Sequence, residues 1–188
     1  MTDAPIDPLV IIELTNLKAA GKLEELAVHP HLGMKPAWIG ELAQSKHPEV
    51  RANLADNPAI TSCPEVVQTL ATDENPHVRW CLAKNPAIAS SPEVAQALAS
   101  DKLPHVRWCL AKNPAITEFP EIVAKLASDE DWRVRQSLAD NPAITSIPAI
   151  TKKLAKDSVS IVRDAAVHTA AFRRIQQTTL PVPTHTVL

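Results

Sequence analysis

The sequence of 188 residues is poor in the residue types on which many folds and active sites depend. It contains no Tyr, two Phe and four Trp, so its core must be built from Leu, Ile, Val and Ala. All three glycines, Gly21, Gly33 and Gly40, lie early in the chain. Phosphate-binding loops and nucleophile elbows need glycine at fixed positions, and neither motif occurs. We therefore expect a protein that is not an enzyme.

Cysteine is also scarce, and the three present, Cys63, Cys81 and Cys109, cannot form an even-numbered disulfide framework. The start of the chain lacks the basic and apolar regions of a secretory signal, and no apolar run approaches the roughly 18 residues of a membrane span. A net charge of -2 gives no global field that attracts nucleic acid or an anionic membrane. We expect a cytoplasmic protein that does not act at membranes, and we do not expect nucleic acid as its partner.

The sequence does contain an internal repeat. The tetrapeptide Asn-Pro-Ala-Ile begins at Asn57, Asn85, Asn113 and Asn141, so 28 residues separate each copy from the next. The dipeptide Val-Arg keeps the same interval at Val50-Arg51, Val78-Arg79, Val106-Arg107, Val134-Arg135 and Val162-Arg163. A fixed period of this length predicts an array of stacked helical units rather than a globular enzyme core.

One unit, residues 75–102, predicts two short helices separated by a proline-marked turn. We call the helix that carries Val-Arg the B helix. Val78, Cys81 and Leu82 form its apolar stripe, and it must end before Pro86 because the residue ahead of a proline is disfavoured in the α region. We expect the B helices to be very short, with partial 3₁₀ character.

The second helix of the unit, which we call the A helix, follows the turn. Its predicted start is the capping-box pattern Ser90-x-x-Glu93, which also occurs as Ser62-x-x-Glu65, with a proline in the first turn. Neither helix is long enough to be stable in isolation, so burial against neighbouring units must hold both.

The repeat sets the expected domain organisation, a single helical array over residues 1–177. The expected parts are an N-terminal cap (1–21) with a helix over 5–20, a degenerate unit (22–46), four regular units (47–158), a C-terminal cap helix (159–177) and a flexible tail (178–188). In the degenerate unit, Lys22 and Leu23 occupy the positions of Val-Arg. An atypical unit is expected at the end of such an array.

The pattern Leu98-Ala99-Ser100-Asp101, Val106-Arg107, Leu110-Ala111-Lys112-Asn113-Pro114 resembles the leucine-rich repeat variant family and, more loosely, HEAT repeats. The resemblance covers residues 22–168. It implies an all-α fold, a right-handed alpha-alpha superhelical solenoid of short α/3₁₀ helix pairs. One founding type of the family carries an iron-sulfur cluster on clustered N-terminal cysteines. This chain has no cysteine before Cys63, so we expect no cofactor.

An Asp lies six residues before each of four arginines in the repeat. The pairs are Asp73 and Arg79, Asp101 and Arg107, Asp129 and Arg135, and Asp157 and Arg163. Such a row could bind phosphates or carboxylates of a ligand. The alternative is a structural Asp-Arg ladder that joins the A helix to the B helix and to the next unit, and the regularity of the pairs favours this ladder.

The positions that vary between units are the candidates for function. His77, Trp80 and Lys84 lie on one face of a B helix, and His105, Trp108 and Lys112 repeat them; the equivalent face of the next unit carries Arg133 and Gln136. We call these eight residues the B-face stripe. Because exposed Trp and Arg are frequent interface hot spots, the stripe is a candidate binding surface. The alternative is that both Trp side chains only pack sideways between helices.

The His-x-x-x-Cys spacing at 77–81 and 105–109 can chelate a metal, but stacked helices about 8–10 Å apart are too distant for one tetrahedral site, and we expect no metal. The predicted function is a non-catalytic scaffold that binds a protein or peptide, and the cations of the stripe favour an acidic one. The alternative is nucleic-acid binding or a DNA glycosylase-type activity of the HEAT-like class on the same face.

Overall fold

The structure is a computed structural model that describes residues 8–179, and all regular secondary structure in this range is helical. It begins with α1 (Pro8–Ala19). None of the described helices combines the length and the apolar character needed to cross a membrane.

After α1 the helices form three rows. The B helices are α2 (Leu23–Val28), α4 (Pro48–Asp56), α6 (Pro76–Lys84), α8 (Pro104–Lys112), α10 (Trp132–Ala139) and α12 (Ser160–Thr179). The A helices are α3 (Pro36–Ala43), α5 (Pro64–Ala71), α7 (Pro92–Ala99), α9 (Pro120–Leu126) and α11 (Pro148–Leu154). The 3₁₀ helices are η1 (Leu32–Met34), η2 (Pro58–Ser62), η3 (Pro86–Ser90), η4 (Pro114–Glu118) and η5 (Pro142–Ser146).

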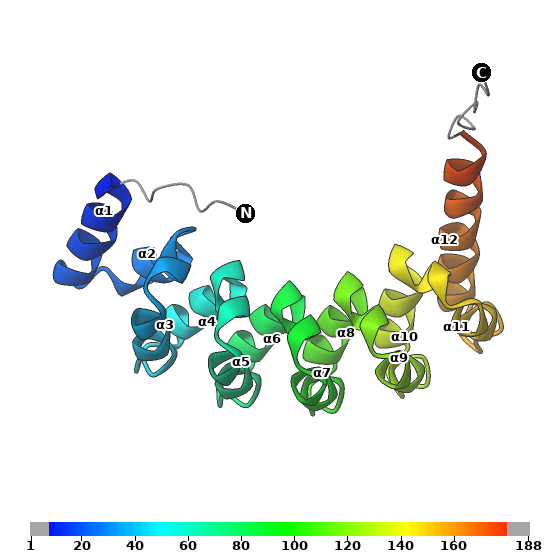
Figure 1. Ribbon diagram of the computed structural model, residues 1–188. Helices are drawn as coiled ribbons and strands as arrows, with labels where there is room; N and C mark the ends of the chain where they lie inside the picture. Colours follow the sequence, from blue (N-terminus) through cyan, green and yellow to red (C-terminus); the bar gives the residue numbers. More distant parts are fainter. Residues whose placement is uncertain (1–7, 180–188) are drawn as a thin grey trace, which may run out of the picture.

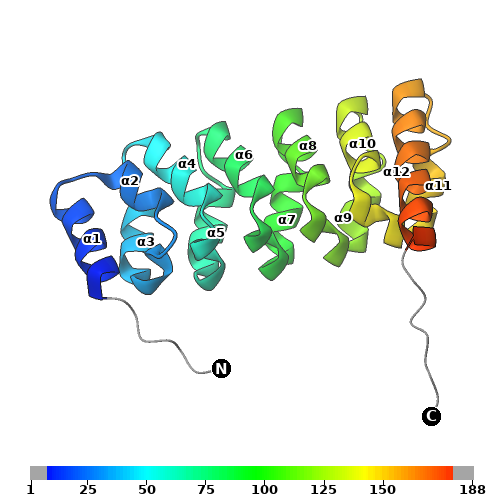
Figure 2. The same cartoon turned by 90° about the horizontal axis from the view of Figure 1, so that it is seen from above.

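Neighbouring members of each row lie side by side. Contacts join α4 to α6, α6 to α8 and α8 to α10, and similar contacts join α5 to α7 and η2 to η3. Seen from above, the B helices form one long edge and the A helices the other (Figure 2). From the side, the rows follow a shallow arc, and α1 and α12 rise at its two ends on the same side (Figure 1).

Proline determines where most of these helices begin and end. Pro76 and Pro92 occupy the first turns of α6 and α7, where a missing N–H and a fixed φ are tolerated. Asn85, which precedes Pro86, is extended (φ -73°, ψ 133°) and terminates α6. A proline after the asparagine disfavours the α region there, so each regular B helix stops at its Asn-Pro.

The local structure differs from the sequence expectation in two respects. The regular B helices are α-helices, nine residues long in α6, and the 3₁₀ helices are formed by the Asn-Pro-Ala-Ile segments, so a unit has three elements rather than a helix pair. The capping-box prediction was wrong: Ser91, not Ser90, caps α7, and the Ser90 hydroxyl donates to the carbonyl oxygen of Ala87. Ser62 likewise donates to Ala59, because the 3₁₀ helix extends through both serines.

Two expected boundaries concern the ends of the array. The final helix extends to Thr179, beyond the expected end at residue 177. Residues 5–7 of the expected N-terminal helix and residues 180–188 of the expected flexible tail lie outside the described residues.

The core is a continuous layer of aliphatic side chains between the rows. In one unit, Val78, Leu82, Ile88 and Leu98 are all fully buried, and equivalent residues repeat along the array. Because the helices of this unit, α6 and α7, each have fewer than three turns, this burial against neighbours supplies most of their stability.

Asparagine links each unit to the one before it. The Asn85 side chain is buried; its Nδ2 donates to the carbonyl oxygens of Ala55 (2.8 Å) and Asn57 (3.0 Å), and its Oδ1 accepts from the N–H of Ala87 (2.8 Å). The equivalent three hydrogen bonds are made by Asn57, Asn113 and Asn141, two of them in each case to the preceding unit.

The substitution Asn85→Ala should destabilise the fold by about 2–4 kcal/mol, because it leaves the buried Ala55 carbonyl and Ala87 N–H without their side-chain partner and removes one of two hydrogen bonds to the Asn57 carbonyl. Chemical denaturation followed by circular dichroism measures this loss. Asn75→Ala is the matched control, since Asn75 is partly exposed and its side chain only caps α6 by accepting from His77 N–H. The control should cost about 1 kcal/mol. Equal losses for the two variants would contradict the linking role.

Candidate functional site

The Asp-Arg ladder connects successive units. Arg79 donates from Nε and Nη2 to the carboxylate of Asp101, at 2.5 and 3.1 Å, and from Nη1 to the main-chain oxygen of Asp73, at 2.7 Å. Four bidentate rungs of this kind are formed, Arg51–Asp73, Arg79–Asp101, Arg107–Asp129 and Arg135–Asp157. An Arg and the Asp six residues before it, in the preceding unit, therefore meet only through the main chain, whereas the ion pair joins an Arg to the Asp at the end of its own unit.

The rungs are buried and electrostatically satisfied. The Arg79 side chain is 10% exposed and that of Asp101 is 5% exposed. Burial raises the pKa of Asp101, but the hydrogen bonds from Arg79 and from the Leu103 N–H lower it further, so that the net shift is downward. The hydrogen bond to Asp101 raises the pKa of Arg79. These guanidinium groups are thus committed to carboxylates of the chain itself.

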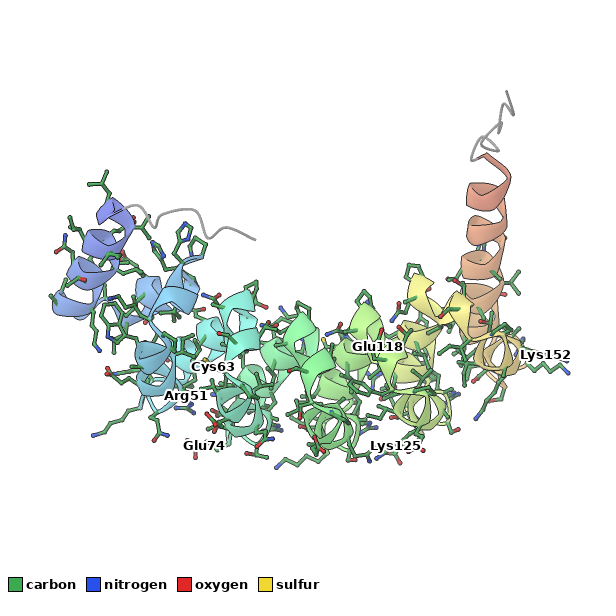
Figure 3. The ribbon with its side chains drawn as sticks, in the orientation of Figure 1. Arg51, Cys63, Glu74, Glu118, Lys125 and Lys152 are labelled. Atoms are coloured by element: carbon green, nitrogen blue, oxygen red, sulfur yellow. The ribbon has the colours of Figure 1, made fainter. Side chains whose placement is uncertain are left out.

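The two ends of the ladder differ from its middle. Arg51, which the sequence-based pairs omitted, forms the first rung and also lies 3.7 Å from the Glu74 carboxylate (both labelled in Figure 3). Arg163 donates to the main-chain oxygens of Asp157 and Ser158, and no carboxylate among residues 8–179 forms an ion pair with it.

The B-face stripe lies along the edge formed by α6, α8 and α10. His77, Lys84, His105, Lys112 and Arg133 are exposed, whereas Trp80, Trp108 and Gln136 are half-buried. Both Trp side chains also pack against the aliphatic core. The two interpretations of these residues, exposed surface and sideways packing, therefore each describe part of the side chain.

Each Trp of the stripe is held by side chains of its own helix. The His77 ring stacks on Trp80 with centroids 5.0 Å apart, and His105 lies 4.8 Å from Trp108. The Lys84 Nζ lies 4.2 Å from the Trp80 ring centroid and 3.3 Å from an Asp56 carboxylate oxygen. A cation over an indole face is attracted by the ring quadrupole, so the Trp80 ring is kept in one orientation.

Burial raises the pKa of the Cys109 thiol on α8, and the largest effect that opposes this rise is an interaction with the Trp80 indole. Cys81 and Cys109 are both buried, which is typical of small core residues.

The cationic residues of the stripe differ in their availability. Arg133 forms a bidentate ion pair with Asp131, the N-cap of α10, and this contact lowers the pKa of Asp131 to about 2. The Lys84 ammonium group forms an ion pair with the Asp56 carboxylate. No ion pair joins Lys112 to another described residue, so Lys112 is the most available cation of the stripe.

The His77 Nε2 lies 4.0 Å from the Cys81 Sγ, as the spacing predicts for neighbours on a helix. Within residues 8–179, no three His, Cys, Asp or Glu side chains come together in an arrangement that could hold a metal ion.

Comparison with protein-family models found no match, and neither did comparison with curated proteins.

The ladder makes the stability of the protein dependent on pH. The hydrogen bonds from Arg135 hold the pKa of Asp157 below its ordinary value, so the ionised carboxylate stabilises the fold above that value. This stabilisation is lost as the pH falls through the folded-state pKa. The substitution Asp157→Asn should therefore destabilise the protein by about 2 kcal/mol at pH 7, and by progressively less below about pH 4.

Urea unfolding at a series of pH values measures this difference. The control is Asp140→Asn, because Asp140 is exposed at the end of α10 and no ion pair joins it to another described residue. It should change stability by no more than about 0.5 kcal/mol. A loss for Asp157→Asn that is independent of pH would contradict the role of the ionised carboxylate.

Proposed function

We propose that the chain is a right-handed helical-repeat solenoid with a period of 28 residues. In this architecture it resembles the leucine-rich repeat variant family. Two kinds of regular contact support this proposal. Asparagine bonds join residues 28 and 30 apart, and the ladder joins residues 22 apart, in each successive unit. Contacts only between neighbouring units are the defining property of solenoids, which function mainly as extended binding surfaces.

We further propose that this protein is a non-catalytic scaffold of the cytoplasm, and that it binds an acidic protein or peptide on the B-face stripe. The observation that carries the proposal is the pair of half-exposed Trp side chains on adjacent helices, each in ring contact with a histidine, with a lysine over one of them. Rigid, partly exposed aromatic side chains beside cations are typical hot spots, because their contact surface is already ordered before binding.

The positive charge of the stripe, and the lack of an ion pair at Lys112, favour an acidic partner. Lys112 and the two exposed histidines lie beside Trp108 and Trp80, and Lys112 has no carboxylate of its own unit to neutralise it. A partner carboxylate that approaches Trp108 would gain this cation without breaking an existing ion pair. Electrostatic complementarity of this kind contributes mainly to association rate and specificity.

The ladder arginines give no support to a nucleic-acid site. A protein that follows a phosphate backbone needs several free cations, and Arg51, Arg79 and Arg107 are buried in ion pairs. The exposed stripe also has carboxylates close by, at Asp56 and Asp140. The glycosylase-type alternative is therefore not the function that we propose.

The double variant Trp80→Ala/Trp108→Ala should remain folded but no longer bind the partner. The amount of partner captured by the variant is measured against the amount captured by the unaltered protein. A loss of more than about tenfold is expected if these side chains are hot spots. Trp132→Ala is the control, since Trp132 is 40% exposed and lies outside the stripe. If the double variant unfolds in circular dichroism, the Trp side chains are core residues and the proposed site is wrong.

Charge reversal tests the acidic nature of the partner separately. Lys84→Glu/Lys112→Glu should weaken capture, whereas Lys102→Glu/Lys152→Glu should not, because Lys102 lies outside the stripe and Lys152 points away from α11 (Figure 3). Fluorescence anisotropy with labelled duplex and single-stranded DNA at low salt should show no binding. Binding that falls steeply with salt would instead support the nucleic-acid function.

A further inference from the structure

The ladder has a position without a rung at its N-terminal end. A rung joins an Arg to the Asp 22 residues later, as in Arg51–Asp73. One unit earlier, these two positions are occupied by Leu23 and Ser45. The degenerate unit therefore lacks both charged groups of a rung.

The backbone around this position keeps the geometry of a rung. The Ser45 Oγ accepts from the N–H of His47, as Asp73 accepts from Asn75 one unit later. The main-chain oxygen of Ser45 accepts from Arg51 Nη1 at 2.7 Å, as that of Asp73 accepts from Arg79. Only the guanidinium and the carboxylate are missing.

A cavity of about 300 Å³ occupies the place of the missing groups. Leu23 and Ser45 both line it, and its apolar walls are Leu26, Trp38 and Leu42. Leu26 and Leu42 are buried and belong to the core, so the walls are fixed. A concave and mostly apolar space of this size lies at the lower end of the range typical of small-molecule sites.

Cations predominate among the charged groups that line this cavity. Lys18 Nζ lies 4.7 Å from the Trp38 ring centroid and 2.5 Å from a carboxylate oxygen of Glu41. Lys46 lines the cavity and is exposed, and no ion pair joins it to another described residue. The Lys18 charge is thus compensated by Glu41, whereas the Lys46 charge is not.

We propose that this cavity, which is separate from the B-face stripe, binds a small amphiphile that consists of an apolar body and one carboxylate. The apolar body lies between Trp38 and the leucines. The carboxylate pairs with Lys46 and accepts a hydrogen bond from the Ser45 hydroxyl. A cationic ligand is disfavoured, because it would meet the Lys18 and Lys46 charges.

Titration of the protein with octanoate tests the proposal, with the indole N–H signals in ¹⁵N–¹H correlation spectra as the readout. The Trp38 signal should shift with saturation, while those of Trp80, Trp108 and Trp132 remain unchanged. Octanol and octyltrimethylammonium should bind at least about fivefold more weakly than octanoate. The substitution Lys46→Met should weaken the binding of octanoate by a similar factor. Equal binding of octanoate and octanol, or no saturable shift of Trp38, would overturn the proposal.

The double variant Leu23→Arg/Ser45→Asp rebuilds the missing rung and provides a further test. The new guanidinium and carboxylate should fill the cavity and abolish the Trp38 shift, while the melting temperature stays the same or rises. Unchanged octanoate binding in this folded variant would show that the ligand lies elsewhere. The comparison of octanoate with octanol on the unaltered protein decides the proposal even if this variant fails to fold.

Discussion

The rest of the structure depends on the asparagine that precedes proline in each regular unit. The proline terminates the B helix, and the last carbonyl groups of a helix have no partners within it. The asparagine of the following unit supplies the missing donors, as Asn85 does for Ala55 and Asn57. Because these amides are buried, they require both acceptors. The ends of α2, α4, α6 and α8 are therefore completed by the unit stacked on each of them.

The Arg-Asp rungs add a second dependence between the same units. Arg79 bonds the main chain of Asp73 behind it and the carboxylate of Asp101 ahead of it. A single side chain thus joins its B helix to the end of the preceding unit and to the end of its own unit. The terminal units lack one neighbour, and the ladder changes there: Leu23 and Ser45 replace a rung, and Arg163 bonds only main-chain oxygens within residues 8–179.

The repeat and its residue chemistry predicted the all-α character, the proline-marked helix starts, and the buried positions such as Val78 and Leu82. They did not predict the ladder partners, because each Arg has one Asp at the end of the preceding unit and another at the end of its own. The stacking geometry decides between the two. The N-cap of α7 was misplaced by one residue, since nothing in the sequence shows that a 3₁₀ helix includes Ser90. The half-buried state of Trp80 depends on its packing against the core of the array, which helical periodicity within one unit does not describe.

The regular positions leave little freedom for binding chemistry. A buried asparagine or arginine that bonds two units cannot be exchanged without leaving polar groups unpaired, so these residues are constrained by the array itself. Specificity must come from positions that no neighbouring unit requires. The B-face stripe is one such set, because its side chains reach the edge of the array. The missing rung is another: where the array ends, the carboxylate and guanidinium are no longer required for stacking, and the space they leave is concave, apolar and bordered by lysine.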